Sequence, residues 1–189
     1  MTDDLALAVR SGLPDPLRVL VLRYPRIGWE AHPHFTELTR FWLERHLGFR
    51  RMHRMLVEDT REFLDRDRDA QAYAGSLYRL ASRFLNDLHG HHMIEDYQYF
   101  PILQRLDPRI ASGFDLLESD HQALDAAIQG LAETTNAVLA AVRDRQPAAA
   151  GAGVLDGRLA EFGRLINRHL IDEEELVVPV ILDHPEAGL

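Results

Sequence analysis

Two stretches of the chain repeat one pattern of side chains that can bind a metal. A histidine and a glutamate stand four residues apart at His91 and Glu95, and again at His169 and Glu173. In both stretches an acidic residue directly follows the glutamate, and a proline stands six residues after it. Within a helix, this spacing puts the imidazole and the carboxylate one turn apart on one face. Two such helices predict a shared metal site, because each can offer both side chains to an ion from a rigid backbone.

The composition limits the fold and the partners. A chain of 189 residues, 46% of them hydrophobic, suits a single domain with a substantial core. The 21 basic and 30 acidic residues give a formal net charge of -9, so we expect neither nucleic acid nor a membrane as a partner. No stretch is long and apolar enough to cross a bilayer, and the first residues are acidic, which predicts a cytoplasmic protein. The absence of cysteine excludes disulfides, thiolate metal sites and iron-sulfur clusters.

Hydrophobic periodicity predicts four long helices, at about residues 35–65, 70–99, 111–145 and 159–177. A charged turn at Asp65–Asp69 separates the first two, and the alanine-rich and glycine-rich stretch Pro147–Gly157 is predicted to be a linker before the fourth. Pro101 is expected to bend or end the second helix, and the fourth is expected to stop before Pro179. No strand is indicated. The predicted fold is therefore all-α, an up-down-up-down four-helix bundle.

The ends of the chain are predicted to lie outside the bundle. Residues 1–34 carry several prolines, so we expect an irregular N-terminal strap packed on the bundle, with a short amphipathic piece at about Leu17–Leu22. Residues 35–182 would form the bundle and residues 183–189 a C-terminal tail. The prolines and aromatic residues of the strap motivate the hypothesis that it covers the mouth of the bundle and controls access.

One histidine from each predicted helix should lie at the same level of the bundle. Antiparallel neighbours share a level when they are equidistant from their connection, and the midpoints between successive histidines fall at positions 68.5, 106 and 145, at or near the three connections. The flanking residues are apolar, so these histidines and the two glutamates would form a polar layer inside the core. The predicted metal ligands are His46, His91, Glu95, His121, His169 and Glu173.

This set of ligands predicts the metal. Four imidazoles and two carboxylates suit iron or manganese and are acceptable to zinc. Two ions fit better than one, because a single ion would leave buried carboxylates without partners, which is costly. A structural alternative is a hydrogen-bonded polar network that sets helix register without any metal. We find no phosphate loop, dinucleotide fingerprint or Ser/His/Asp arrangement, so we assign no catalytic residue and no organic cofactor.

Three further histidines lie close to the predicted ligands in sequence. His53 is an alternative that would replace or supplement His46, because it lies seven residues later on about the same helix face, although the spacing of the four histidines favours His46. His89 and His92 are expected to point away from the face of His91, so we predict supporting or surface positions for them rather than metal ligation.

The charged neighbours of the pattern have simpler expected roles. Asp96, Glu174 and Glu175 are most simply solvated acids, with the alternative that Asp96 or Glu174 orients a ligand histidine. Arg50 and Asp125 each stand one turn after a predicted ligand. These two side chains either pair with each other, or one of them gates an open metal position.

The doubled motif resembles the hemerythrin-like family, also called the HHE cation-binding domain. The resemblance covers about Phe41 to Pro179 and rests on the six predicted ligands. It implies a four-helix bundle around a non-heme di-iron centre with bridging carboxylates, in proteins that bind or sense dioxygen, handle iron, or respond to nitric oxide or peroxide. We therefore expect two iron ions, with manganese or zinc as substitutes, and a protein that binds, senses or reacts with dioxygen or a related small ligand. The alternative is iron storage, iron delivery or metal sensing without turnover.

The chain departs from the oxygen-carrying hemerythrins in three places. Those proteins have a second histidine one turn after the first on the third helix, where this chain has Asp125. They end with His-x-x-x-x-Asp, whereas His169 and Glu173 are four residues apart. On the first helix, Arg50 stands one turn after His46. These departures argue against reversible oxygen carriage.

Overall fold

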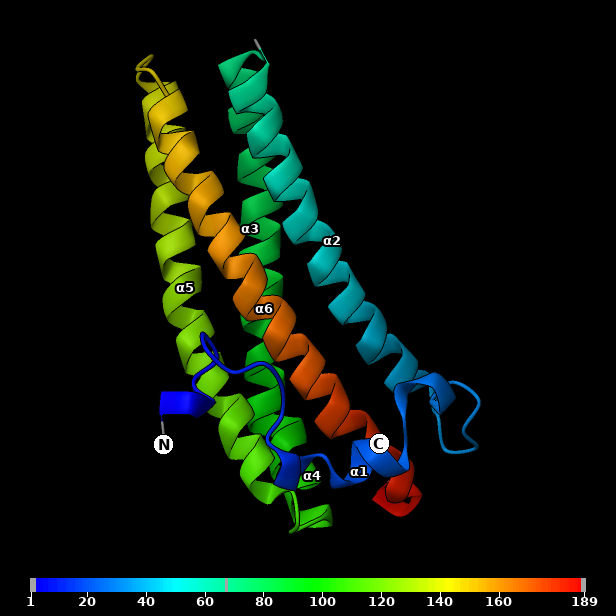
Figure 1. The fold of residues 1–189 in the computed structure, drawn as a ribbon. Coiled ribbons are helices and arrows are strands. Elements are labelled where there is room, and N and C mark those ends of the chain that lie inside the picture. Colours follow the sequence, from blue (N-terminus) through cyan, green and yellow to red (C-terminus); the bar gives the residue numbers. More distant parts are fainter. Residues whose placement is uncertain (1–2, 67, 188–189) are drawn as a thin grey trace. The chain divides into compact units, whose positions relative to one another are not determined.

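The computed structural model describes residues 3–66 and 68–187, and the elements found there are helices (Figure 1). No strand occurs in these two ranges, so the prediction of an all-α protein is confirmed. Asp67 of the predicted charged turn lies outside the described residues, as do the first two residues of the predicted strap and the last two of the tail. No helix of the described part is long and apolar enough to span a membrane.

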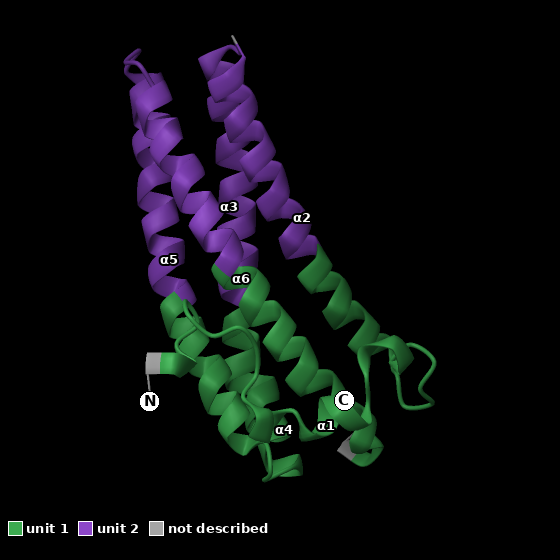
Figure 2. Ribbon diagram, in the orientation of Figure 1, with its two compact units in different colours: residues 1–47, 92–123, 165–189 green, residues 48–91, 124–164 purple. Residues whose placement is uncertain are grey.

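The chain divides into two compact units, shown in different colours in Figure 2. Unit 1 comprises residues 1–47, 92–123 and 165–189, and unit 2 comprises residues 48–91 and 124–164. The long helices are α2 (Glu37–Asp65), α3 (Ala70–Ile94), α5 (Ala111–Arg143) and α6 (Ala149–Asp183), and each contributes residues to both units. The shorter helices, α1 (Val19–Arg23) and α4 (Phe100–Leu106), belong to unit 1.

Side-chain caps fix where α2 and α3 begin. The Thr36 hydroxyl accepts a hydrogen bond from the backbone N–H of Thr39 at 3.2 Å. The Asp69 carboxylate accepts one from the backbone N–H of Ala72 at 2.8 Å. A cap of this kind contributes about 1 kcal/mol by satisfying an amide that the helix itself leaves without a partner.

The second predicted helix changes its winding just before Pro101. α3 ends at Ile94, a π-helical turn covers Glu95–Tyr99, and α4 continues beyond it. Within the turn, the backbone N–H of Phe100 donates to the carbonyl of Glu95, five residues back. Pro101 has no backbone N–H to donate, so it interrupts the α-helical hydrogen bonding at the same place. Such turns are often found at functional sites.

The predicted linker at Pro147–Gly157 is wrong, because α6 already begins at Ala149. Alanine is the best helix former, and the cost of about 1 kcal/mol per glycine is offset by burial of residues such as Leu155, which is 1% exposed. Gly151 also permits a close approach to α5, since a Cβ there would lie 3.3 Å from a methyl group of Val138.

The predicted stop before Pro179 is also wrong, because α6 continues to Asp183. An interior proline costs a helix about 3 kcal/mol. Three residues around it, Val178, Val180 and Leu182, are at most 1% exposed. Burying each such side chain contributes about 1.5–3 kcal/mol, which together exceeds the cost of the proline.

Residues 3–34, here called the N-terminal segment, pack on the helices of unit 1. In Figure 1 the segment runs from beside α5 to the C-terminal end of α6. Leu17 and Leu20 join a buried cluster with residues of α4, α5 and α6, among them Leu117 and Val180. Trp29 joins a second cluster with residues at the end of α6. The segment therefore forms part of the core of unit 1.

Unit 2 has an aromatic core of its own. Phe84 and Phe162 are at most 1% exposed and meet edge to face, with ring centroids 5.8 Å apart. The ring of Tyr73 stacks on Phe63 at 4.3 Å, and its hydroxyl donates to Thr60 at 3.1 Å. These contacts hold α2, α3 and α6 together within this unit.

Candidate metal centre

Six buried side chains of unit 1 form two groups that could each hold a metal ion. One group is a histidine with two glutamates and the other is three histidines, and the ligand atoms within each group lie within 4.8 Å of one another. Every member is at most 2% exposed. The first group contains His46 of α2, Glu95 of the π-helical turn and Glu173 of α6, and the second contains His92 of α3, His121 of α5 and His169 of α6. A third group in this unit, with Asp107, Asp183 and His184, is only partly buried.

The two glutamates lie between these groups. One carboxylate oxygen of Glu173 is 3.6 Å from Nε2 of His46 and 3.2 Å from Nε2 of His169. An oxygen of Glu95 is 3.8 Å from Nε2 of His121. Each glutamate therefore lies near a histidine of the second group. Glu173 also lies near His46 of its own group, so its carboxylate stands between histidines of both groups.

Three of the histidines share one orientation. In each, Nδ1 lies next to a carboxylate, and Nε2 faces the glutamates. A carboxylate accepts a hydrogen bond from Nδ1–H, so the lone pair of the neutral ring is on Nε2. This is the form of imidazole that binds a metal through Nε2. The pairs are His46 with Glu174 at 3.0 Å, His121 with Asp96 at 2.7 Å and His169 with Asp120 at 3.3 Å.

Two of these carboxylates are held by arginines of the N-terminal segment. Arg10 donates to Asp120 at 2.6 Å and to Asp172 at 2.8 Å. Arg26 lies 2.6 Å from the second oxygen of Glu174. Burial would raise the pKa of Asp120, but hydrogen bonds from Arg10 and from His169 outweigh it and hold that pKa below its usual value. Asp120 is therefore ionised and able to accept a hydrogen bond from Nδ1–H of His169.

Glu95 has the opposite electrostatic setting. Burial raises its pKa well above the usual value, and the nearby carboxyl group of Glu173 raises it further. The indole N–H of Trp42 donates to one oxygen of Glu95 at 2.8 Å and holds the carboxyl group in place. Burial and the neighbouring carboxyl group thus favour the protonated form of Glu95 when no cation is bound, and a metal ion would displace that proton.

The donor atoms fit a bound cation. The Nε2 atoms of His121 and His169 are 3.2 Å apart. Two imidazole nitrogens bound at right angles to one ion, each about 2.1 Å from it, lie about 3 Å apart. Since both rings direct Nδ1 at carboxylates, their Nε2 lone pairs face each other and are satisfied by a shared cation or an extra proton.

The surface position that the sequence allowed for His92 is wrong, because this side chain is 2% exposed. Its ring stacks on His121, with centroids 4.1 Å apart and planes at 11°, and meets His169 edge to face at 5.4 Å. Adjacent residues point about 100° apart on a helix, and the buried face of a core helix can be wider than that. His92 can therefore face inwards even though its neighbour His91 is buried as well.

His91 is the last residue of the first stretch of unit 2, residues 48–91, and is 8% exposed. Its ring lies 5.0 Å from that of Phe49 in the same unit. His91 precedes Glu95 by one turn of the continuous helix, as the sequence pattern requires. Its role as a ligand stays a prediction.

His53 takes part in the packing of unit 2. Its Nε2 donates to the backbone carbonyl of Leu159 at 2.8 Å, and its ring lies 6.3 Å from that of Phe84. It belongs to neither group of ligand atoms in unit 1, whereas His46 does. Of the two histidines that the sequence offers on α2, His46 is the one placed beside the glutamates.

The acidic neighbours are less exposed than the sequence suggests. Glu174 is 2% exposed, so the expectation of a solvated acid is wrong, and the alternative that it orients a ligand histidine agrees with its contact to His46. Asp96 is partly exposed but likewise contacts His121. Glu175 is half-buried and belongs to neither group of ligand atoms.

Sequence reasoning missed Asp120 and Arg10. Asp120 directly precedes a predicted ligand, which was a signal available in the sequence. Arg10 carried no signal at all, because only the fold brings it to Asp172, 162 residues further along the chain.

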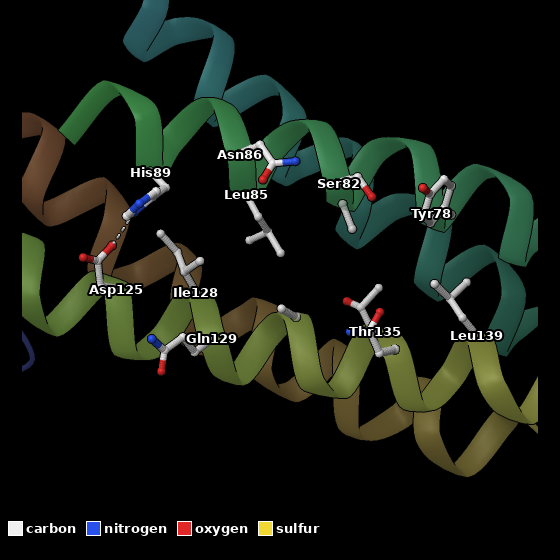
Figure 3. Close-up of a pocket in the computed structure, with 13 residues that line it drawn as sticks. Tyr78, Ser82, Leu85, Asn86, His89, Asp125, Ile128, Gln129, Thr135 and Leu139 are labelled. Carbon is white, nitrogen blue, oxygen red and sulfur yellow. Dashed lines mark hydrogen bonds and ion pairs between the residues drawn. The ribbon is translucent and has the colours of Figure 1, made fainter. Parts of the chain in front are cut away.

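Unit 2 contains a separate pocket of about 440 Å³ between α3 and α5 (Figure 3). Leu85 and Ile128 supply apolar walls, and Asn86 and Gln129 supply amides. His89 and Asp125 form a 3.1 Å pair at one end, so Asp125 has a partner on α3. None of the residues lining this pocket belongs to the two ligand groups.

One protein-family model matches the chain, that of the hemerythrin HHE cation-binding domain, over residues 37–181. The chain has no match among the curated proteins and none among the solved structures. The matched range spans α2 to α6 and includes the six buried side chains described above.

Proposed function

Because the chain belongs to the hemerythrin family of HHE cation-binding domains, we propose that it binds two iron ions and uses them to bind, sense or react with dioxygen or a related small ligand such as peroxide or nitric oxide. One observation carries the proposal. Three histidines have Nδ1 held by carboxylates and Nε2 directed towards two buried glutamates. A purely structural network would not need three imidazoles in their metal-binding orientation around carboxylates that repel each other.

The proposed ligands divide between the two ions. Three of them come from the group of His46 with the two glutamates, and His91 joins it because it lies one turn before Glu95. The other ion would be held by the remaining imidazoles, and the two glutamates would neutralise the charge of both ions. His92 is added to the set predicted from the sequence because of its place beside His121 and His169. The proposed ligands are His46, His91, His92, Glu95, His121, His169 and Glu173.

The side chains around the ligands set what the site can do. Two bound irons would supply redox chemistry and open positions for a small exogenous ligand. The glutamates neutralise charge, and the partners of Nδ1 keep each imidazole in one tautomer and one orientation. Trp42 fixes Glu95, and near-complete burial keeps bulk water away from the proposed ions. Manganese and zinc would also be accepted by these donors.

We also infer that residues 35–182 form one up-down-up-down bundle, with residues 1–34 packed on it and residues 183–189 as a tail. The connections support this: α3 begins five residues after α2 ends, α5 five residues after α4 ends, and α6 six residues after α5 ends. Short connections favour antiparallel neighbours. The cytoplasmic location stays a prediction.

Metal analysis and visible spectroscopy test the proposed function. Purified protein loaded with ferrous iron without oxygen and then exposed to air should contain about two irons per chain and show charge-transfer bands that azide shifts. His46→Ala should lose at least one iron, whereas the matched variant His53→Ala on the same helix should keep both. Protein that binds no iron, manganese or zinc and gains no stability from them would refute the proposal.

One observation favours the alternative of iron storage or sensing. Every ligand described in unit 1 is at most 2% exposed, so an exogenous molecule reaches the ions only when the structure opens locally. In a storage or sensing protein the iron would bind and stabilise the fold, but azide and peroxide would leave the spectrum unchanged. The same titration therefore separates the two functions.

A further inference from the structure

Arg10 is an unusual residue of the N-terminal segment, because its charged side chain is buried. The side chain is 2% exposed and contacts the carboxylates of Asp120 and Asp172, which are 3% and 0% exposed. A buried charge of this kind is stable only with a full set of partners. Arg10 obtains one more by donating to the carbonyl of Leu5 at 3.1 Å. Its pKa lies above the usual value because these carboxylates outweigh the effect of burial.

The contact of Arg10 continues to a proposed ligand. Asp120 accepts from Nδ1 of His169, and Nε2 of His169 is 3.2 Å from Glu173. A chain of polar contacts thus runs from the N-terminal segment through α5 to α6. Moving Arg10 would leave Asp120 buried without its cation and would change the acceptor that orients His169.

Arg26 begins a second chain of the same kind. It contacts Glu174 at 2.6 Å, and Glu174 accepts from Nδ1 of His46 at 3.0 Å. The guanidinium also stacks over the ring of Trp29, 4.7 Å from its centroid, and Trp29 is 2% exposed. The two chains end on different groups of ligand atoms, one on His46 and the other on His169.

We propose that Arg10 and Arg26 are positioning residues of the metal centre, so that docking of the N-terminal segment and occupancy by metal form one linked equilibrium. This inference rests on the proposed function. A metal bound at Nε2 polarises the imidazole, which makes Nδ1–H a stronger donor to a carboxylate that an arginine holds. Linkage is reciprocal, so metal strengthens docking of the segment by the same factor by which docking strengthens metal binding.

Groups that are hydrogen-bonded to a metal ligand, as Asp120 and Glu174 are to the proposed ligands, typically change affinity by 10–100-fold. The arginines act one contact further out, so the coupling should not exceed that factor, and apolar residues such as Leu17 and Leu20 also hold the segment on unit 1. The segment should therefore stay docked without metal but open more often. Its amide hydrogens should exchange faster by about the same factor of 10–100.

Hydrogen exchange of α1 tests the linkage in the intact protein. The amide of Tyr24 donates to the carbonyl of Leu20 at 2.8 Å and reports on the segment. Ferrous iron added without oxygen should slow its exchange by 10–100-fold, and the ferrous affinity should be measured by competition with a chelator on the same sample. Protection that does not change while iron binds would overturn the inference and leave the proposed function standing.

Arg23 offers a matched control for Arg26. Both are exposed and contact a carboxylate on α6, but the partner of Arg23 is Asp183, which stands in a third, partly buried group with Asp107 and His184 and in neither of the two buried ligand groups. Arg26→Gln should weaken ferrous binding about 10-fold and reduce the iron-dependent protection by the same factor, and Arg23→Gln should change neither. Arg10→Gln should reduce ferrous binding and iron-dependent protection as Arg26→Gln does, and circular dichroism checks that the variant folds.

The possible results of these measurements distinguish the linkage from the proposed function. Equal effects of Arg26→Gln and Arg23→Gln, or a loss of protection that is the same with and without iron, would show a merely structural role for Arg26 and overturn the inference. Wild-type protein that binds no iron would refute the proposed function and the linkage together.

Discussion

Glu95→Gln should act in opposite directions on the metal-free and the metal-loaded protein. Ligand oxygens of Glu95 and Glu173 lie within 4.8 Å of each other, at 1% and 0% exposure. At that distance two ionised carboxylates repel by about 3.5 kcal/mol for an effective dielectric constant of about 20. The protein limits this cost by retaining a proton, so the neutral amide should raise the free energy of unfolding of metal-free protein by about 1–3 kcal/mol at pH 7.

The same substitution should remove most of the stabilisation by metal. A neutral amide neither bridges nor neutralises two ions, and a 100-fold loss of affinity removes about 2.7 kcal/mol of stabilisation at saturating metal. Urea unfolding with a chelator and with ferrous iron measures both effects. Glu175→Gln, on α6 but outside both ligand groups, is the control and should change neither. A metal-free Glu95→Gln protein less stable than wild type would refute the electrostatic reasoning.

The stabilisation by Glu95→Gln should depend on pH. The pKa of Glu95 is raised in the folded protein, first by burial and then by Glu173, so the unfolded chain releases this proton at lower pH than the folded one. Wild-type stability is therefore fully present below the unfolded pKa of about 4.3 and falls as pH rises towards the folded pKa. The difference between variant and wild type should shrink towards zero as pH falls to about 4.

Three further predictions concern single sites. Arg145 lies two residues beyond the end of α5 and has a φ of 57°, so Arg145→Gly should stabilise the protein by about 1 kcal/mol in urea unfolding, and a loss would contradict the left-handed cap. A Cβ on Gly163 would meet the ring of His53 at 2.5 Å, so Gly163→Ala should cost about 1–3 kcal/mol, most of it absent in a His53→Ala background. His92→Ala should weaken ferrous binding at least 10-fold in chelator competition, whereas His89→Ala should not, and equal effects would remove His92 from the proposed ligands.

The repeated motif could be found because its information is local. A histidine and a glutamate four positions apart have a helical spacing, so two ligands on each helix follow from the sequence alone. The levels of His46 and His121 followed from counting residues between connections. Which of two adjacent side chains points into the core could not be predicted. Side chains 100° apart on one helix, such as those of His91 and His92, can both be buried when the core face is wide.

Helix boundaries near glycine and proline could not be predicted for a related reason. The alanine and glycine stretch before Gly157 has the composition of a linker, but the close approach of Gly151 to Val138 is a property of the folded unit. Pro179 is unfavourable for α6 locally, and only the burial of residues such as Val180 and Leu182 outweighs it. In both places tertiary packing outweighs the low helix propensity of the local sequence.

The buried charges of unit 1 are where sequence, stability and function meet. Arg10, Asp120, Asp172 and Glu174 are each at most 8% exposed, and burying charges is a poor way to stabilise a fold, since well-packed apolar residues do as well or better. Their arrangement makes sense once each carboxylate is considered with the atom it contacts, because Asp120 and Glu174 each hold the Nδ1 of a histidine whose Nε2 faces the glutamates. A cation bound among these carboxylates and imidazoles would offset part of that cost. The energetics of the buried charges therefore supports the proposed metal site by an argument that is independent of the family to which the chain belongs.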